Sequence, residues 1–268
     1  MTPPVRSPTD ELAPIDPRIR QRRVAVERSR GRRRLLWILG VIVALCLVTG
    51  VVALLHTPLF SAQVVTVTGP HPHTSSASIV AAAGLAHHPP LISTDPGATA
   101  ARVEALPFIA TARVSRHWPD GIHIAVTERV PAVQMAGPAA SWSTLDGYGR
   151  TLQIQPARLP GLAVLAVHAP GRVIPPSAVG GSLPASASAG LTVARTLPPA
   201  FSAQVVSVTV AHDATISMAL NSGITVLLGT ATDLPTKYED VAAILAHGSL
   251  HSTSTIDVTV PQSPAVSG

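Results

Sequence analysis

The sequence has few of the residues that commonly stabilise small exported domains. It contains one cysteine, Cys46, and aromatic residues make up 3% of its 268 residues. A disulfide within the chain needs two cysteines, so the folded part must be held together by its apolar core. Because aromatic side chains are scarce, that core is expected to consist of small aliphatic and β-branched side chains.

Catalytic motifs are also missing. The chain contains no Gly-x-Ser-x-Gly, His-Glu-x-x-His or Ser-x-x-Lys sequence, and its cysteine lies within a long apolar run. Asp120, Asp146 and Asp213 stand beside glycine or in turn-forming sequence, which favours a structural role over paired catalytic carboxylates. These absences favour a protein that is not an enzyme.

No metal site or cofactor is expected either. The best candidates for metal ligands are the histidine pairs His71/His73 and His87/His88. Both pairs stand in expected loops beside prolines, without the supporting acids that usually orient histidine ligands. We therefore interpret these histidines as loop residues.

The longest apolar run, residues 35–55, contains no charged residue and no Asn, Gln or Pro. A helix of this length spans about 30 Å, which matches the hydrocarbon core of a bilayer. A buried core helix would usually keep a polar stripe, and the apolar region of a cleaved signal peptide would be shorter. The run is therefore predicted to be an uncleaved transmembrane helix.

Charge is distributed unevenly around this run. Between Arg18 and Arg34 there are nine arginines and one acid, Glu27, whereas nine basic and ten acidic residues follow residue 55. The positive-inside rule then places residues 1–34 in the cytoplasm, as a basic disordered arm whose part from 18 to 34 can be helical where it enters the span. Such arginines contact anionic lipid headgroups, and because no folded nucleic-acid reader accompanies them, DNA binding is not expected.

Directly after the span, a small sheet with two helices on one side is predicted. Val65 and Val67 alternate with threonines in a strand, and Asp95 followed by Pro96 is a typical helix start. Pro119-Asp120-Gly121 is a turn sequence in which glycine supplies a free φ angle. The expected order is β-α-α-β-β, with strands at 59–69, 109–118 and 122–129 and helices at 74–85 and 95–106.

The rest of the chain is predicted to form a mostly antiparallel β domain with one or two helices. Residues 168–190 are rich in Pro, Gly and Ser and are expected to form an irregular connection. The expected strands are 132–136, 142–145, 151–155, 205–210, 215–220, 223–228 and 254–260, and the expected helices are 189–197 and 233–247. The chain is therefore assigned to the α+β class with a single N-terminal transmembrane helix.

The final helix and strand have the clearest periodicity. Asp233 is positioned to cap the helix and Gly248 to end it, and its apolar stripe comprises Leu234, Tyr238, Val241, Ala242 and Leu245. The strand alternates apolar residues expected to face the core with outward polar ones, namely Ile256, Val258 and Val260 with Asp257 and Thr259. As the last strand of its sheet, it is expected to leave a backbone edge open to a partner.

Three stretches, in a fixed order, carry a resemblance to known proteins. They are LFSAQVVTVTG at 59–69, LPFIATARVSRHWPDGIHIAVTERVP at 106–131 and IDVTVPQSPAV at 256–266. The second is the most specific, and LDGYG at 145–149 adds a hairpin. Together they resemble the FtsQ (DivIB) family of bacterial cell-division proteins, and the Ala-rich composition is similar to that of actinobacterial proteins. Residues 178–197 depart from the family pattern.

The resemblance implies a POTRA domain at 56–131, a β domain at 132–261 and a tail at 262–268. It implies a non-enzymatic divisome scaffold in the cell membrane at the septum, which binds FtsB-like (DivIC) and FtsL-like coiled-coil proteins and links them to the septal peptidoglycan synthase. In the family the partner pairs with the last strand and the helix before it. These positions match Ser254, Thr255, Ile256, Asp257, Val258, Thr259 and Val260, together with Tyr238, Val241 and Leu245.

Two other classes of function stay open. One is a membrane-anchored cell-wall enzyme, which activity of the exported part on peptidoglycan would reveal. The other is a POTRA-bearing transport component, which would normally carry several POTRA units or a barrel, and the sequence shows neither.

Overall fold

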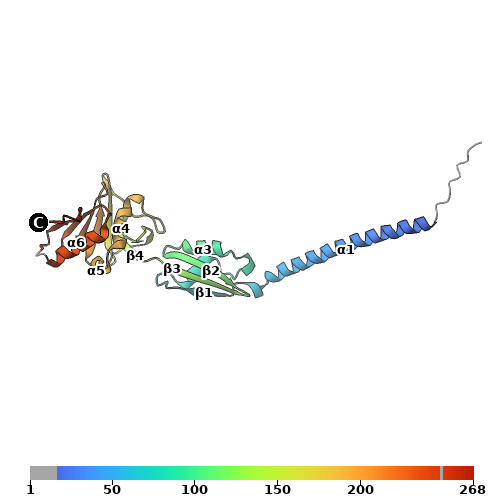
Figure 1. The fold of residues 1–268 in the computed structure, drawn as a ribbon. Coiled ribbons are helices and arrows are strands. Elements are labelled where there is room, and N and C mark those ends of the chain that lie inside the picture. Colours follow the sequence, from blue (N-terminus) through green and yellow to red (C-terminus); the bar gives the residue numbers. More distant parts are fainter. Residues whose placement is uncertain (1–16, 248–249) are drawn as a thin grey trace, which may run out of the picture. The chain divides into compact units, whose positions relative to one another are not determined.

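The computed structural model describes residues 17–247 and 250–268, with the backbone alone for 17–33 and Ala200. The chain divides into two compact units, Met1–Phe60 and Ser61–Gly268. The first is built on one long helix, and the second contains two β-sheets with their helices (Figure 1).

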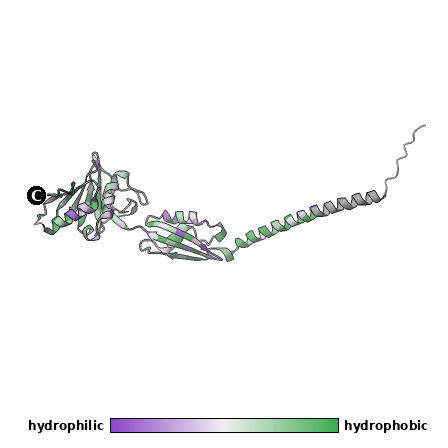
Figure 2. Ribbon diagram, in the orientation of Figure 1, coloured by the Kyte–Doolittle hydropathy of each residue, from purple (hydrophilic) through white to green (hydrophobic). Residues whose placement is uncertain are grey.

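Helix α1, Pro17–Leu55, contains the expected span. Its segment Arg34–Leu55 is long and apolar enough to cross a membrane, and none of it is buried inside the protein. Figure 2 shows this part as a hydrophobic stretch of the helix. The backbone is already helical from Pro17, as expected where the basic stretch enters the span, and the 3-10 helix η1, Pro58–Phe60, follows. The expected disorder of residues 1–16 lies outside the described residues.

Residues 61–129 form the small sheet, whose strand order is β1-β3-β2. β1 runs parallel to β3, with Val65 opposite Ile122, and β2 runs antiparallel to β3. The elements are β1 Val64–Thr68, α2 Ser76–Ala83, the 3-10 helix η2 Leu91–Ser93, α3 Pro96–Glu104, β2 Ile109–His117 and β3 Gly121–Glu128. The predicted order β-α-α-β-β is confirmed.

One face of the small sheet carries its core. Ile122, Ile124 and Val126 of β3 are fully or nearly fully buried there, as their alternation predicted. The helix starts are fixed by local bonds: the Asp95 carboxylate accepts the N–H of Gly97 at 2.9 Å, with Pro96 in the first turn. Gly84 ends α2 with a φ of 75°, in the left-handed region that favours glycine.

The turn between β2 and β3 corrects one expectation. Residues 118–121 join the two strands as predicted, but the φ of Gly121 is not positive. The reason for glycine there is space, since a Cβ atom would lie 3.0 Å from the carbonyl oxygen of His117. A close approach of two backbones, rather than a special dihedral angle, therefore explains this residue.

Residues 131–268 form the large sheet, with the order β13-β12-β11-β10-β9-β7-β4-β5-β6 and β8 paired to β7. Most pairs are antiparallel, as predicted, and three are parallel: β4 with β7, β7 with β9 and β11 with β12. The strands are β4 Pro131–Ala136, β5 Trp142–Asp146, β6 Thr151–Gln155, β7 Ala163–Ala169, β8 Arg172–Val173, β9 Val205–Val210, β10 Ile216–Leu220, β11 Thr225–Gly229, β12 Thr255–Asp257 and β13 Ala265–Ser267.

Three of these strands were not predicted. β7 lies in the middle of the sheet between β4 and β9, β8 falls within the residues expected to be irregular, and β13 lies in the expected tail. The first five residues of β7, AVLAV, are all apolar, so no alternation of polar and apolar residues reveals a strand there. Its two parallel neighbours identify it only through contacts distant in sequence.

Helices α4 Ser188–Thr196 and α6 Leu234–His247, with the short α5 Pro199–Ser202, accompany the large sheet (Figure 1). α4 packs against β4, β7 and β9. The expected helices are confirmed, but Asp233 has a φ of 50° instead of the extended backbone typical of a capping residue. The expected stop at Gly248 lies outside the described residues.

Candidate functional site

The strand expected to bind a partner, β12, lies near one end of the large sheet. It pairs in parallel with β11, with Val226 opposite Ile256, and antiparallel with β13, with Val266 opposite Ile256. The expectation that this strand has an open edge is therefore wrong for the chain in this state, because residues 265–267 cover it. In the sequence, only Val266 could have indicated β13, because Pro261 and Pro264 stand shortly before it.

The backbone of β12 alternates between its two neighbours. The carbonyl of Ser254 accepts the N–H of Thr225 at 3.1 Å, and the N–H of Val258 donates to the carbonyl of Leu227 at 3.0 Å, so both residues bond to β11. Because successive residues of a strand point their backbone groups to opposite sides, those of Thr255 and Asp257 face β13. A strand that took the place of β13 would therefore bond to the backbone groups of Thr255 and Asp257.

The strand is shorter than the predicted 254–260. Asp257 accepts the backbone N–H of Thr259 at 2.9 Å through its side chain, which turns the chain away from the ladder. Bonds from the N–H and hydroxyl of Thr259 lower the pKa of Asp257. As a result Val260, expected to face the core, is 57% exposed, and that expectation is wrong.

The other side chains of the strand follow the predicted alternation. Ile256 and Val258 are fully buried in the core, while Thr255 and Asp257 are half-buried and Thr259 is exposed. Ser254 is also buried, and its hydroxyl accepts the N–H of His251 at 3.1 Å. The strand thus contributes its apolar face to the core and its backbone edge to β13.

The candidate side chains of α6 lie largely under the helix. Tyr238 and Val241 are buried and Leu245 is half-buried, whereas Ala242 is exposed. The hydroxyl of Tyr238 donates to the carbonyl of Val193 at 3.3 Å. Burial raises the pKa of the Tyr238 hydroxyl. These residues anchor the helix, and only their rims can touch a partner.

A groove that the sequence did not reveal runs beside Tyr238. Its volume is about 410 Å³, and its lining includes Phe201, Pro235 and Ala242. The rings of Phe201 and Tyr238 lie 6.2 Å apart at their centroids. The groove offers apolar surface next to the predicted helix positions, on the side of α5.

Lys237 is a buried charged residue of α6 that was not part of the predicted apolar stripe. Its side chain is 1% exposed, and its ammonium donates to the carbonyls of Leu228 at 2.7 Å and Thr230 at 3.0 Å. Burial lowers the pKa of Lys237. The ammonium fastens α6 to the end of β11, next to β12.

A second hollow of about 570 Å³ lies where the small sheet continues into β4. Arg129 donates to the carboxylate of Asp146 at 2.8 Å and to the carbonyl of Ile109 at 3.1 Å. Asp146 also accepts the backbone N–H groups of Tyr148 and Arg150. These saturated bonds give Arg129 and Asp146 a structural role, as the sequence suggested for Asp146.

The histidines expected in loops do lie there. His73 stacks on Phe108 with ring centroids 4.8 Å apart, and its Nδ1 lies 3.0 Å from the carboxylate of Glu128. Burial would raise the pKa of Glu128, but bonds from His73 and Thr74 outweigh it and lower that pKa. Within the described residues, no group of three or more His, Cys, Asp or Glu side chains is arranged to hold a metal ion.

Comparison with known proteins agrees with this fold. Residues 60–129 match the model of the FtsQ-type POTRA domain, and they correspond to the small sheet with its two helices. The cell-division protein FtsQ of Mycolicibacterium smegmatis is 31% identical over 88% of this chain and 66% of that relative. FtsQ of Mycobacteroides abscessus is 28% identical over 89% of this chain and 72% of that relative.

A Streptomyces relative matches over most of both lengths. The FtsQ protein of Streptomyces bingchenggensis is 30% identical over 88% of this chain and 86% of its own length. The match to the Mycolicibacterium relative includes only about two thirds of that protein's length. With an apolar N-terminal helix, a POTRA domain and a large β-sheet domain in sequence, this chain belongs to the FtsQ family of cell-division proteins.

Proposed function

We propose that this protein is a non-enzymatic, single-pass membrane scaffold of the divisome. Its arm at 1–34 lies in the cytoplasm, the span is 35–55, and the POTRA domain at 56–131 and β domain at 132–261 lie outside. The scaffold acts at the septum and connects FtsB-like and FtsL-like proteins to septal peptidoglycan synthesis. Family membership and the nine arginines of residues 18–34 support this assignment.

The partner binds, in this proposal, as a strand along β12. This binding mode is supported by the shortness of β13, the strand that now covers this edge. β13 has three residues, and all three are exposed. Backbone groups of Thr255 and Asp257 would pair with the partner strand, and side chains would reach the rims of Tyr238, Val241 and Leu245. β-Strand addition gains affinity from main-chain bonds and specificity from alternate side chains. The partner strand thus replaces β13.

Proline substitutions test this binding mode. Thr255→Pro and Asp257→Pro each remove an N–H that faces away from β11, so the core pairing of β12 is kept. Loss of one such bond is expected to weaken binding of the FtsB-like protein by about tenfold. Affinity purification from dividing cells and the frequency of septa measure the effect. Folded variants that bind and divide like the parent contradict the proposal.

Two further proline variants locate the edge. Val258→Pro removes the N–H that bonds to Leu227, so it should destabilise the domain itself. Val266→Pro removes an N–H on the outer edge of β13, because Val266 lies between the two residues that face β12. Lost binding in Val266→Pro, with retained binding in Thr255→Pro, would mean that the partner adds to β13 instead.

Orientation is tested separately. An enzyme reporter that is active only outside the cytoplasm should be active when fused after Gly268 and silent when fused before Arg18. The reverse pattern would contradict the proposed topology. Peptidoglycan cleavage or synthesis by the purified protein would favour the alternative of a membrane-anchored cell-wall enzyme.

A further inference from the structure

The exposed large apolar side chains of the small sheet and its helices are gathered at one end. Within residues 61–129, all of them described, the exposed large apolar side chains are Val64, Ile92 and Trp118, at 55%, 41% and 50% exposure. A small soluble domain usually scatters such side chains singly over its surface. Their distribution therefore requires an explanation.

Backbone bonds bring these three segments together. The carbonyl of Asp120 accepts the N–H groups of Gln63 at 2.9 Å and Val64 at 3.1 Å, which places the turn after Trp118 against the start of β1. Ser61 forms a bridge with Pro90, two residues before Ile92. We call residues 61–64, 87–93 and 118–121 the tip of the domain.

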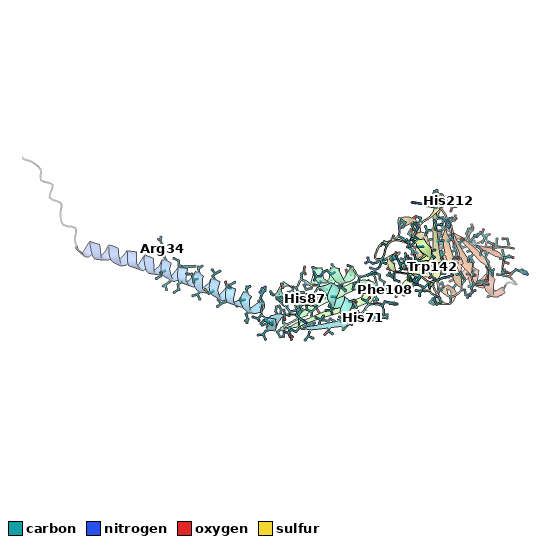
Figure 3. The ribbon with its side chains drawn as sticks, turned by 180° about the vertical axis from the view of Figure 1, so that it is seen from behind. Arg34, His71, His87, Phe108, Trp142 and His212 are labelled. Carbon is teal, nitrogen blue, oxygen red and sulfur yellow. The ribbon has the colours of Figure 1, made fainter. Side chains whose placement is uncertain are left out.

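The opposite end has a different character. His73 stacks on Phe108 and contacts Glu128 there, and these polar groups satisfy one another. In Figure 3, His87 lies toward one end of the domain, and His71 and Phe108 lie toward the other. Within residues 61–129, the exposed large apolar side chains thus lie at the tip, while Val130, which is 77% exposed, follows in the connection to β4.

The tip is also the part of the domain joined to the span. Five residues, 56–60, separate the last residue of α1 from Ser61. Even a fully extended chain of this length reaches only about 20 Å, so the tip cannot move far from the bilayer surface. The bilayer is consequently the apolar phase that the tip meets at the highest effective concentration.

We propose that the tip rests on the lipid bilayer, with Trp118, Ile92 and Val64 inserted into the interfacial region. Tryptophan prefers this zone because its ring is apolar and its N–H is polar. Ile92 and Val64 add apolar area from the two segments that lie next to this turn. Membrane contact at the tip would fix the POTRA domain relative to the membrane, and it requires no partner protein.

Fluorescence of Trp118 in the full-length chain tests the proposal. Trp37→Phe and Trp142→Phe leave Trp118 as the one tryptophan. The protein is placed in nanodiscs of phosphatidylcholine, either unmodified or brominated near the top of the acyl chains. Bromine quenches only nearby indoles, so inserted Trp118 should lose emission in brominated lipid and should be shielded from iodide in the water.

Charged variants separate insertion from mere tethering. Ile92→Asp and Val64→Asp in this background should abolish quenching by bromine and restore quenching by iodide. The matched control is Val173→Asp, which changes a side chain of 55% exposure on β8 and should leave both unchanged. Thermal unfolding of each variant checks that the domains stay folded.

Two results would overturn the proposal. One is Trp118 emission that is the same in both lipids and fully accessible to iodide. The other is bromine quenching that persists when Ile92 and Val64 are both aspartate, since tethering alone would then explain it. Shielding of Trp118 in cells but not in nanodiscs would show that a protein covers the tip, which also contradicts lipid contact.

Discussion

The two sheets differ in how their outermost strands are held. In the small sheet the edge strand β2 has nine residues, follows β3 along most of its length, and buries Ile109 completely. In the large sheet the edge strand β13 has three residues, pairs at three positions, and buries none of its side chains. A strand held by so little apolar burial can be exchanged for another strand, whereas β2 cannot leave without opening its core.

The largest loss of stability is expected in the small sheet, from overpacking at Gly69, just after β1. Its φ is 102°, and a Cβ atom would overlap the carbonyl oxygen of Val126 in β3. Gly69→Ala is expected to lower the free energy of unfolding by about 3 kcal/mol or more. Gly161→Ala is the control, with φ 81° and no atom within 4 Å of its Cβ, and should cost about 1 kcal/mol. Equal losses in urea unfolding would mean that the small sheet yields at this contact.

The next largest loss of stability is expected at Lys237, which holds α6 against the end of β11, beside β12. Lys237→Ala leaves the carbonyls of Leu228 and Thr230 without this donor and opens a cavity, so it should cost about 2 kcal/mol. Lys237→Met keeps the volume and should cost less. Equal losses would show that the ammonium bonds, and not the packing, hold the helix.

Lys237 also gives a pH dependence. Burial lowers its pKa in the folded protein below the usual 10.5, so the unfolded chain binds more protons in the window between the two values. The free energy of unfolding of the parent should therefore rise as pH approaches 10.5, relative to Lys237→Met. Parallel unfolding profiles of the two proteins across this range would contradict the assignment.

A smaller loss of stability in the small sheet is expected at the turn between β2 and β3. Gly121→Val places a Cβ atom 3.0 Å from the carbonyl oxygen and 3.1 Å from the Cβ of His117. We expect a loss of about 1 kcal/mol, measured as a lower melting temperature. An unchanged melting temperature would mean that the turn relaxes without loss.

The smallest effect on stability is expected at β13, the edge strand of the large sheet. Deleting residues 262–268 removes β13, whose exposed side chains bury little, and should change the free energy of unfolding by about 0.5 kcal/mol or less. The same deletion should strengthen binding of a partner strand to β12, because the competitor is gone. Weaker binding would instead assign β13 a direct role in the contact.

Prediction from sequence succeeded where the relevant information is local. Asp95 with Pro96, the alternation of Ile122, Ile124 and Val126, and the turn at 118–121 each lie within a few residues of the feature they specify. In the candidate site, the alternation of Ile256 and Val258 was predicted correctly. Val260 was not, because the bond from Thr259 to Asp257 ends the strand before it.

The sequence by itself determined the apolar N-terminal helix, the POTRA order and the family, because apolar length, caps and turn residues act within short segments. Only the tertiary structure decided that β7 lies between β4 and β9, that β13 covers β12, and that Lys237 is buried. The place of β7 depends on backbone groups that meet across long stretches of chain, while β13 and Lys237 contact nearby segments that no alternation or capping pattern marks. A pairing between distant segments is selected by the whole core, and the residues of either segment alone do not specify it.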